Sequence, residues 1–364
     1  MKVKRLYVNL FYSEVKEGAY MATIREISDK AKVSIATVSK VLNGKKGVSQ
    51  ETIDNVMAIA RDLNYRPNLT ARSLKKGQSR TLGVITEDLT VFNTPEIVDG
   101  IDAYCESNGY HYILGNLRFN KRFGNHPDTE ECSELVHAQV DTMLSKQVDG
   151  IIYIGYHSRA IVPVRNDFEI PFVYTYCYST DPKIPSVLYD DQKAAYEATQ
   201  LLINRGHRDI GVIAGQAESI HTSNRILGYQ EALYNNKIPY NPKLTLNGDW
   251  ERDKGYELCE KLLKAGATAI FAHNDIMATG VIEYCNQYGI QIGKDLALIG
   301  FDNREVGTVC RPTLSTVSLP LFEMGQTATH LLLDMLAGRH IQCGQKLMLA
   351  CSVIERESTR PLPR

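Results

Sequence analysis

The chain has 364 residues and a formal net charge of −1, and 43% of its residues are hydrophobic. The apolar run within residues 1–20 is too short and too often interrupted by polar residues to be a signal peptide or a membrane span. The eight cysteines form no CxxC pair and no Cys/His cluster with metal-ligand spacing, so we expect reduced thiols, no disulfide framework and no metal site.

Residues 23–45 predict two short helices joined by a tight turn. Thr23 and Glu26 have the Ser/Thr-x-x-Glu spacing of a capping box, and Ser34 is placed to cap the second helix. Asn43 and the glycine after it tolerate a left-handed backbone, which ends the second helix after about two turns. This pattern is the layout of a DNA-reading helix-turn-helix.

Residues 49–65 place apolar side chains at helical spacing and predict a third helix that covers the first two. Because caps and apolar stripes are common, an ordinary three-helix bundle is an open alternative on this pattern alone. Charge favours DNA binding, since residues 21–80 hold 12 Lys/Arg against 5 Asp/Glu (net +7) and residues 81–364 hold 25 against 35 (net −10). A basic head on an acidic body is expected of a segment that neutralises phosphates.

After residue 80, short apolar runs alternate with amphipathic stretches, which is the rhythm of βαβ units. About 280 residues exceed one typical domain and could bury roughly three quarters of their unfolded surface, so we expect a two-lobed α/β body. The runs expected to form buried parallel strands are 81–86, 110–116, 149–155, 172–176, 209–215, 269–273 and 296–301.

The motifs of the chain resemble those of the lactose/galactose repressor family of bacterial transcription regulators. In the N-terminal part they are IREISDKAKVSIATVSKVLNG, VSQETIDNVMAIARDLNYRPN and ARSLKKGQSRTLGVI. In the body, LLINRGHRDIGVIAG, ILGYQEAL, NDIMATG, IGFDN, RPTLSTV and VIERESTRP follow in the family's order, and the resemblance covers about residues 22–361.

The resemblance implies a domain organisation. An all-α helix-turn-helix domain is expected at 21–66, a hinge helix and linker at 67–80, and at 81–364 a body of two doubly wound parallel lobes that binds the effector and pairs two subunits. Residues 1–20 precede the usual start of the family's chains. Met21 is therefore expected to be the natural start and 1–20 an untranslated leader, since the codons for Lys16-Glu17-Gly18 can spell a ribosome-binding sequence.

By this resemblance, base reading falls on Ile35, Ala36 and Lys40 at the start and exposed middle of the second helix, while Thr37 and Ser39 contact phosphates or support the helix. The full set of expected DNA-binding residues is Thr23, Ser34, Ile35, Ala36, Thr37, Ser39, Lys40, Asn43, Arg72, Leu74 and Lys75.

Two residues depart from the family's usual pattern. Many relatives carry Arg where this chain has Lys40, and a lysine contacts guanine as a point donor without the planar fork of a guanidinium. Relatives also commonly carry Gly in the turn where this chain has Lys32, which would cost about 1 kcal/mol if the turn needs a left-handed residue.

The segment NLTARSLKKG predicts a brief helix that Gly77 ends, too short to be stable alone in water. The resemblance implies that it is a hinge helix, which orders when two subunits pair over an operator. Leu74 occupies the position of the leucine that wedges between base steps and bends the duplex. On the residues alone, Leu74 could instead be an apolar anchor in a linker.

The resemblance also implies effector contacts in a cleft between the lobes. Arg225 would reach the ligand with its guanidinium, Asn274 and Asp302 would hydrogen-bond hydroxyls, and Trp250 would stack on a pyranose ring. Each has a structural alternative: a surface ion pair for Arg225, a core position for Trp250 and a helix cap for Asp302. The full set of expected effector residues is Phe92, Tyr176, Asp190, Arg225, Trp250, Asn274 and Asp302.

Together these features imply a cytoplasmic homodimeric repressor of carbohydrate-utilisation genes, whose affinity for double-stranded operator DNA is controlled by a sugar. A corepressor-dependent regulator of another metabolite is an open alternative. A solute-binding protein would need an export signal and would give residues 23–76 no role. An enzyme and a cofactor are not expected, because the chain has no P-loop, GxSxG, HExxH or paired dinucleotide glycines, and His207 matches a structural turn residue.

The wedge assignment predicts the effect of Leu74→Ala. Operator binding should weaken greatly in a gel-shift titration, because the wedge no longer unstacks the central base step. Sugar binding should be intact, and an unchanged operator affinity would contradict the wedge.

Overall fold

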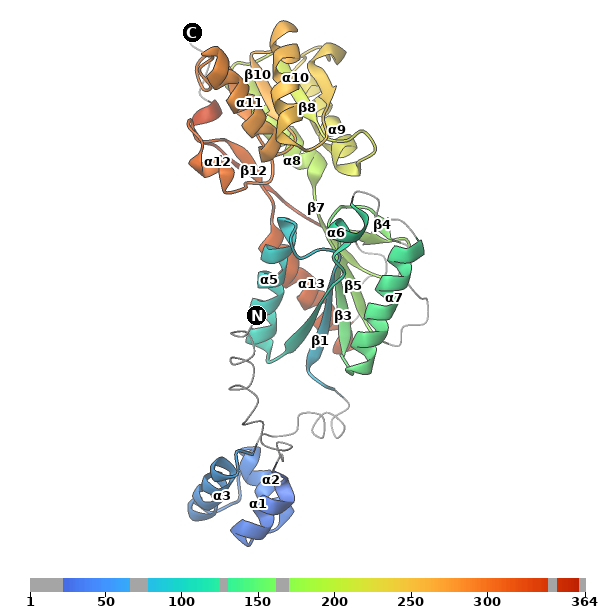
Figure 1. The fold of residues 1–364 in the computed structure, drawn as a ribbon, viewed down its shortest axis with the longest axis vertical. Coiled ribbons are helices and arrows are strands. Elements are labelled where there is room, and N and C mark those ends of the chain that lie inside the picture. Colours follow the sequence, from blue (N-terminus) through green and yellow to red (C-terminus); the bar gives the residue numbers. More distant parts are fainter. Residues whose placement is uncertain (1–21, 66–77, 125–129, 162–169, 340–345, 360–364) are drawn as a thin grey trace, which may run out of the picture. The chain divides into compact units, whose positions relative to one another are not determined.

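The computed structural model describes residues 22–65, 78–124, 130–161, 170–339 and 346–359. The chain divides into two compact units, one ending at Ser79 and one beginning at Arg80, which we call the head and the body. Figure 1 labels their elements.

Three helices form the head, as predicted: α1 (Ile24–Ala31), α2 (Ile35–Leu42) and α3 (Gln50–Asp62). Their core contains Ile27, Val38 and Val56, which are fully buried. Helix α3 ends at Asp62, a few residues earlier than expected, because Asn64 adopts a left-handed φ of 48° and turns the chain.

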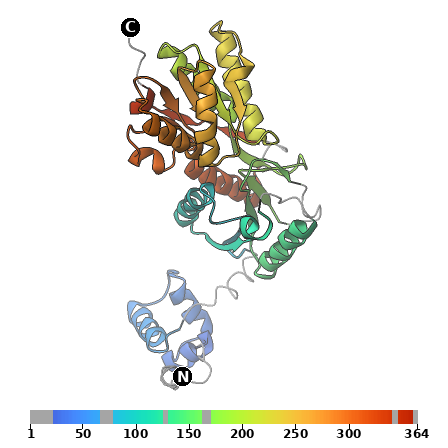
Figure 2. The same ribbon diagram turned by 45° about the horizontal axis from the view of Figure 1, so that its top comes forward.

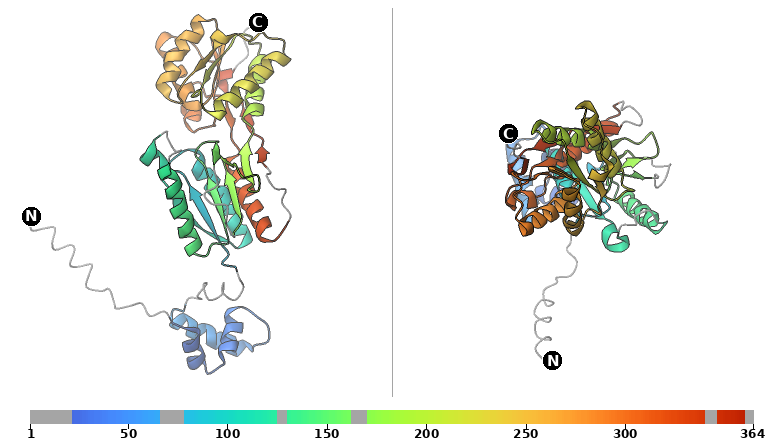
Figure 3. Two further views of the ribbon diagram at one scale, coloured as in Figure 1. Left: turned by 90° about the vertical axis from the view of Figure 1, so that its right-hand side faces the viewer. Right: turned by 90° about the horizontal axis from the view of Figure 1, so that it is seen from above.

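The first lobe of the body is built on a six-stranded parallel sheet in the order β13-β7-β5-β3-β1-β2. Its strands are β1 (Thr81–Thr86), β2 (His111–Asn116), β3 (Gly150–Ile154), β5 (Phe172–Thr175), β7 (Ser186–Tyr189) and β13 (Lys346–Leu349), and a short pair, β4 (Ala160–Ile161) and β6 (Tyr178–Ser179), lies beside it. One face is covered by α5 (Asn93–Asn108) and α13 (Leu321–Leu336), and the other by α6 (Phe119–Phe123) and α7 (Glu130–Ser145). Figures 2 and 3 show α13 and α7 on opposite sides of this sheet.

The second lobe contains a four-stranded parallel sheet in the order β11-β10-β8-β9. Its strands are β8 (Ile210–Ala214), β9 (Thr245–Asn247), β10 (Ala269–Ala272) and β11 (Ala297–Ile299). One face packs on α8 (Asp191–Asn204) and α9 (Ile220–Asn235), and the other on α10 (Arg252–Lys264) and α11 (Asp275–Tyr288). Three short helices complete the lobe: α12 (Val306–Val309), η1 (Pro242–Leu244) and η2 (Glu357–Thr359).

Three stretches of chain pass between the lobes. They are β7 to α8, β12 (Thr316–Ser318) to α13, and β13 to β14 (Ser352–Ile354), and β12 pairs with β14 antiparallel. The first stretch carries the end of β7 directly into α8, so residues 189–191 lie where the two lobes meet. In doubly wound sheets, ligands bind beyond the carboxyl ends of the strands.

Each of the seven predicted strand segments contains a strand, but one of them is not buried. Strand β2 is the sheet edge, and His111, Ile113 and Leu114 are exposed, so the expectation of a buried strand there was wrong. Apolar composition alone does not distinguish an edge strand from a central one. Strands β7, β9, β13 and the β12–β14 pair, which are only three or four residues long, were not predicted from the sequence.

Helices α8 and α9 pack closely, and this contact positions Asp191. A Cβ built on Gly228 of α9 would lie 2.0 Å from the backbone oxygen of Gln192 in α8, so only glycine fits there. The close crossing holds the first residue of α8, Asp191, against His221 and Arg225 of α9.

Among the residues described, no helix is long and apolar enough to cross a bilayer. The cysteines in the same ranges are free thiols, and most of them are buried.

Candidate DNA-binding surface and effector cleft

The first helix of the head begins with the predicted capping box. The Thr23 backbone N–H donates to Glu26 Oε2 at 2.7 Å, and the Glu26 N–H donates to Thr23 Oγ1 at 3.3 Å. Two amides that the helix leaves without intrahelical partners are thereby satisfied.

The second helix is capped at both ends. Ser34 Oγ accepts the Thr37 N–H at 3.1 Å, and the Asn43 side-chain amide donates to the Ser39 carbonyl at 2.6 Å. The left-handed residue after the helix is Gly44, with φ 62°, whereas Asn43 has φ −101°. Asn43 therefore helps to end the helix, and its contact with DNA stays a prediction.

Helix α2 has one buried face and one exposed face. Val38 and Val41 are buried, whereas Ile35, Ala36 and Lys40 are exposed. An isoleucine that is 47% exposed at the start of the helix can contact a thymine methyl group, and an exposed lysine one turn after Ala36 can reach base edges or phosphates. The head thus presents together the three residues expected to read bases.

The turn between α1 and α2 does require a left-handed residue. Lys32 has φ 53° and ψ 37°, and its N–H donates to the Ser28 carbonyl as the C-cap of α1. The strain expected for a non-glycine residue at this position is therefore present. The predicted hinge residues Arg72, Leu74 and Lys75, and the proposed start at Met21, lie outside the described residues.

Arg225 is the centre of a buried network in the body, where its side chain is 3% exposed. Its Nε donates to Asp191 Oδ1 at 2.7 Å, one terminal nitrogen donates to Tyr189 Oη at 3.1 Å, and the other to the His273 carbonyl. The guanidinium carbon lies 3.6 Å from the ring centre of Phe301. Burial alone would lower the pKa of Arg225, but the Asp191 carboxylate outweighs it and raises that pKa.

His221 occupies the other side of Asp191. Its Nδ1 lies 2.7 Å from Asp191 Oδ2, and its Nε2 lies 3.2 Å from the Ser158 backbone nitrogen. Because a backbone N–H can only donate, Nε2 is the accepting nitrogen and Nδ1 carries the proton; this tautomer is assigned from the hydrogen bonds. Burial would raise the pKa of Asp191, but His221 and Arg225 outweigh it and lower that pKa, so Asp191 is ionised.

The side chain of Asp302 is unpaired. It is half-buried, and within the described ranges its carboxylate makes no hydrogen bond or ion pair. Burial raises its pKa to about 8, although Arg225 and Arg304 act in the opposite direction. A carboxylate held near other charges without a donor is a site for a ligand's hydroxyl groups.

Trp250 lies flat against the end of β8. A Cβ on Gly215 would meet the indole ring at 1.9 Å, so the glycine makes room for the ring. The ring centre is 5.7 Å from the guanidinium carbon of Arg225, and the residue is half-buried with φ 77°. An indole in this position offers an apolar face beside polar groups.

The side-chain amide of Asn274 makes hydrogen bonds within the protein. Its Oδ1 accepts the Met277 N–H at 2.7 Å and caps α11, and its Nδ2 donates to the Trp250 carbonyl at 2.9 Å. It therefore positions Trp250, and a direct contact with a ligand stays a prediction.

The remaining predicted effector residues lie at the edges of the network. Tyr176 Oη is 3.5 Å from Tyr189 Oη, and the Phe92 ring of the first lobe lies 5.0 Å from the guanidinium carbon of Arg304 in the second. Asp190 is the N-cap of α8, where its Oδ1 accepts the Lys193 N–H at 2.9 Å.

Sequence reasoning missed Tyr189, Asp191 and His221. Asp191 is the second residue of an Asp-Asp pair, and the predicted residue was the first, Asp190, which caps the helix in the structure. His221 precedes Arg225 by one helical turn, and this i, i+4 spacing was an available signal. His207 lies before β8, and its Nδ1 is 3.1 Å from Thr268 Oγ1, in agreement with a structural role.

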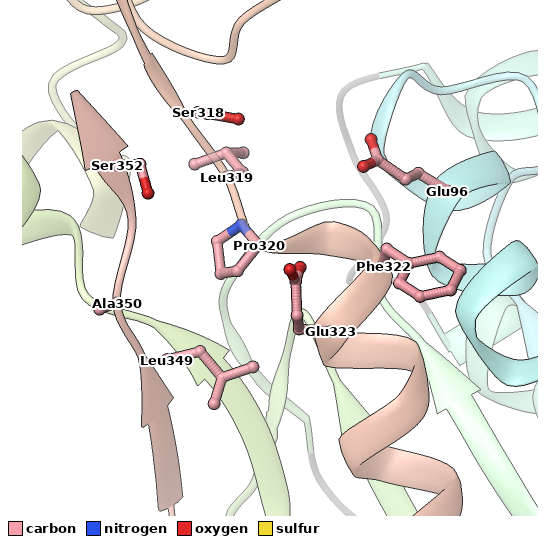
Figure 4. A pocket seen from close by; sticks show the side chains of 9 residues that line it. All are labelled: Glu96, Ser318, Leu319, Pro320, Phe322, Glu323, Leu349, Ala350 and Ser352. Carbon is pink, nitrogen blue, oxygen red and sulfur yellow. The ribbon is translucent and has the colours of Figure 1, made fainter. Parts of the chain in front are cut away.

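A separate hollow of about 370 Å³ lies beside the stretches that pass between the lobes. Figure 4 shows the carboxylates of Glu96 and Glu323 on its walls. None of the predicted effector residues lines it, so it is distinct from the network around Arg225.

Residues 23–68 match the family model described as bacterial regulatory proteins, lacI family, and residues 199–359 match a periplasmic binding protein-like domain. The HTH-type transcriptional repressor CytR of Escherichia coli (strain K12) is 33% identical over 353 residues, which cover 96% of this chain and 100% of CytR.

Two solved structures are also similar. The lac repressor dimer bound to operator and the anti-inducer ONPF has a TM-score of 0.75 and 25% identity, and the match covers 93% of this chain and 99% of that one. A LacI family regulator from Enterococcus faecium with bound ribose has a TM-score of 0.61 and 26% identity, over 78% of this chain and 100% of that one.

The left-handed backbone at Lys32 predicts the effect of Lys32→Gly. The glycine should stabilise the head by about 1 kcal/mol and raise its melting temperature by about 4–8 °C, because it adopts this conformation without strain. Circular dichroism of the full chain measures the transition. Lys30→Gly, inside α1, is the matched control and should destabilise the head by about 1 kcal/mol; a lower melting temperature for Lys32→Gly would refute the strain.

Proposed function

The chain belongs to the lacI family of bacterial regulatory proteins and is a DNA-binding transcriptional regulator, and we propose that a small sugar bound in the cleft around Arg225 sets its affinity for operator DNA. The observation that carries the sugar proposal is the unpaired Asp302 carboxylate beside the Arg225 guanidinium and the Trp250 ring. A carboxylate accepts hydrogen bonds from hydroxyls, and an indole face packs on the apolar face of a pyranose.

DNA reading is assigned to the exposed face of α2, where Ile35, Ala36 and Lys40 contact bases. Thr37 and Ser39, with Thr23, Ser34 and Asn43, place the helix and contact phosphates. The protein works as a homodimer in the cytoplasm, and Arg72, Leu74 and Lys75 form the hinge that orders on the operator. Two heads then read a nearly palindromic site.

Control by the sugar follows from linkage. A ligand that binds one relative position of the lobes better than another shifts the population between them, and DNA binding shifts with it. We propose that sugar binding lowers the affinity for operator DNA. A corepressor would bind the same site and raise that affinity. The chain is proposed to have no enzymatic activity.

The proposed base contacts predict the effect of Lys40→Ala. On a DNA site selected by the unaltered protein from a random duplex pool, affinity should fall about 5- to 150-fold, equivalent to about 1–3 kcal/mol for a lost base contact. Fluorescence anisotropy at several salt concentrations measures it, and affinity should fall steeply with salt. Lys30→Ala, an exposed lysine of α1, is the matched control and should stay within about threefold. Equal losses in the two variants would contradict base reading by Lys40.

The raised pKa of Asp302 predicts a pH dependence of sugar binding. Below its pKa of about 8 the group is mostly protonated and accepts hydroxyl hydrogen bonds less well, so affinity should rise with pH, by at most about tenfold per unit, and level off above 8. Trp250 is the only tryptophan of the chain, so its fluorescence can follow titrations with a panel of mono- and oligosaccharides.

Asp302→Asn is the matched variant for this titration. It should bind the same sugar more weakly and lose the rise between pH 6 and 8. A variant with wild-type affinity and the same pH profile would remove Asp302 from the site, and the failure of every sugar to alter both fluorescence and operator affinity would overturn the sugar proposal.

A further inference from the structure

A hydrogen bond links the two lobes at His221. The imidazole belongs to α9 of the second lobe, and its Nε2 accepts the backbone N–H of Ser158, which follows β3 of the first lobe. The His221 side chain is 6% exposed, so little water competes for this bond. The bond exists only while Nε2 is unprotonated.

The first-lobe side of this bond is held in place by Glu87, a fully buried carboxylate at the end of β1. Glu87 accepts the Tyr156 N–H at 2.9 Å and both terminal nitrogens of Arg159 at 2.8 Å. It also accepts the Tyr153 hydroxyl at 2.6 Å. Residues 156 and 159 are therefore fixed on both sides of Ser158, which aims its N–H at the second lobe.

The second-lobe side leads to the proposed ligand groups. Nδ1 of His221 donates to Asp191, and Asp191 accepts Nε of Arg225, whose guanidinium packs on the Phe301 ring. One imidazole thus joins a fixed amide of the first lobe to the carboxylate that orients Arg225. A rotation of one lobe against the other has to break this bond or move Asp191.

We propose that His221 is a cross-lobe latch, which in its neutral form couples this arrangement of the lobes to the orientation of Arg225 and which opens when Nε2 is protonated. The proposal rests on the proposed function in one respect, that the cleft is the regulatory ligand site. His221 acts through Asp191 and Ser158, so it is a positioning residue.

The groups around His221 allow protonation of the imidazole to break its bond to Ser158 without breaking its bond to Asp191. The titratable and charged groups around His221 are Asp191 on α8, Arg225 on α9, Tyr189 at the end of β7, Tyr176 after β5, and His157, Arg159 and Glu87 around the segment after β3. Asp191 accepts from Nδ1 in both forms of the imidazole. Protonated Nε2 and the Ser158 N–H would direct two hydrogens at each other, so only the cross-lobe bond is lost.

Two substitutions of His221 distinguish its bond to Ser158 from its bond to Asp191. The amide of asparagine is three bonds from Cα, like Nδ1, so His221→Asn can keep the bond to Asp191 and has no atom at the Nε2 position. The amide of glutamine is four bonds from Cα, like Nε2, so His221→Gln keeps an acceptor for Ser158 that does not titrate.

Hydrogen exchange of the Ser158 amide in the full chain, followed by mass spectrometry and corrected for the intrinsic effect of pH, tests the latch. At pH 8 the amide should be protected in the unaltered protein and in His221→Gln, and should exchange at least about tenfold faster in His221→Asn, the loss expected for a hydrogen bond of about 1.4 kcal/mol. At a pH low enough to protonate Nε2, the unaltered protein should lose protection and His221→Gln should keep it.

Wild-type protection in His221→Asn, or protection in the unaltered protein that does not change with pH, would overturn the latch. Protection of β8 (Ile210–Ala214) in the same samples reports folding, and if a variant loses it, the pH series of the unaltered protein decides the question. The experiment needs neither operator nor sugar, so failure of the proposed function, seen as absent operator or sugar binding, is distinguishable from failure of the latch.

Discussion

The body depends on how it holds the Arg225 guanidinium out of water. Burying an isolated charge costs several kcal/mol, and breaking a buried pair costs about 3–5 kcal/mol because it leaves the partner uncompensated. Asp191, Tyr189 and the His273 carbonyl each accept one of its nitrogens, so the guanidinium has a single orientation. Asp191 starts α8 and Arg225 lies on α9, and the close contact at Gly228 keeps these helices together. A packing constraint on two helices therefore fixes the chemistry of the cleft.

In the head, the main constraint is the stability of the short helix α2. A helix of eight residues is not stable alone in water, because nucleation is costly and few hydrogen bonds repay it. Helix α2 is held by Ser34 and Asn43 at its ends and by Val38 and Val41 against the other two helices. The stability of α2 comes from its buried face and its two capped ends. Ile35, Ala36 and Lys40 lie on the exposed face, so the fold of the head does not depend on their side chains. This separation would let the residues proposed to read bases differ among regulators without changing the fold.

Much of this organisation could be predicted from local sequence, and the errors have physical reasons. The capping box at Thr23 depends only on residues within one turn, and all seven predicted strand segments contain strands because burial is encoded in apolar composition. Whether a strand lies at an edge depends on pairing between distant segments, so β2 was taken as buried. Asp190 was predicted and Asp191 was not, because two adjacent carboxylates differ only in the direction that the first turn of α8 gives their side chains. Ser158 and Glu87 gave no local signal, since their partners lie more than 60 residues away.

The charges of the cleft constrain the ligand that the protein is proposed to bind. Arg225 carries one positive charge that Asp191 already balances, so ionised Asp302 adds a negative charge without a counterpart in direct contact. Its pKa is raised because burial disfavours the charged form. A ligand with neutral hydroxyls lowers this cost by donating hydrogen bonds, whereas a phosphate or carboxylate group would raise it by repulsion. Arg225 offsets little of that repulsion, because its charge is already paired with Asp191. The electrostatics of the cleft therefore favour a neutral polyhydroxyl compound over an anionic one, and the Trp250 face favours one with a ring.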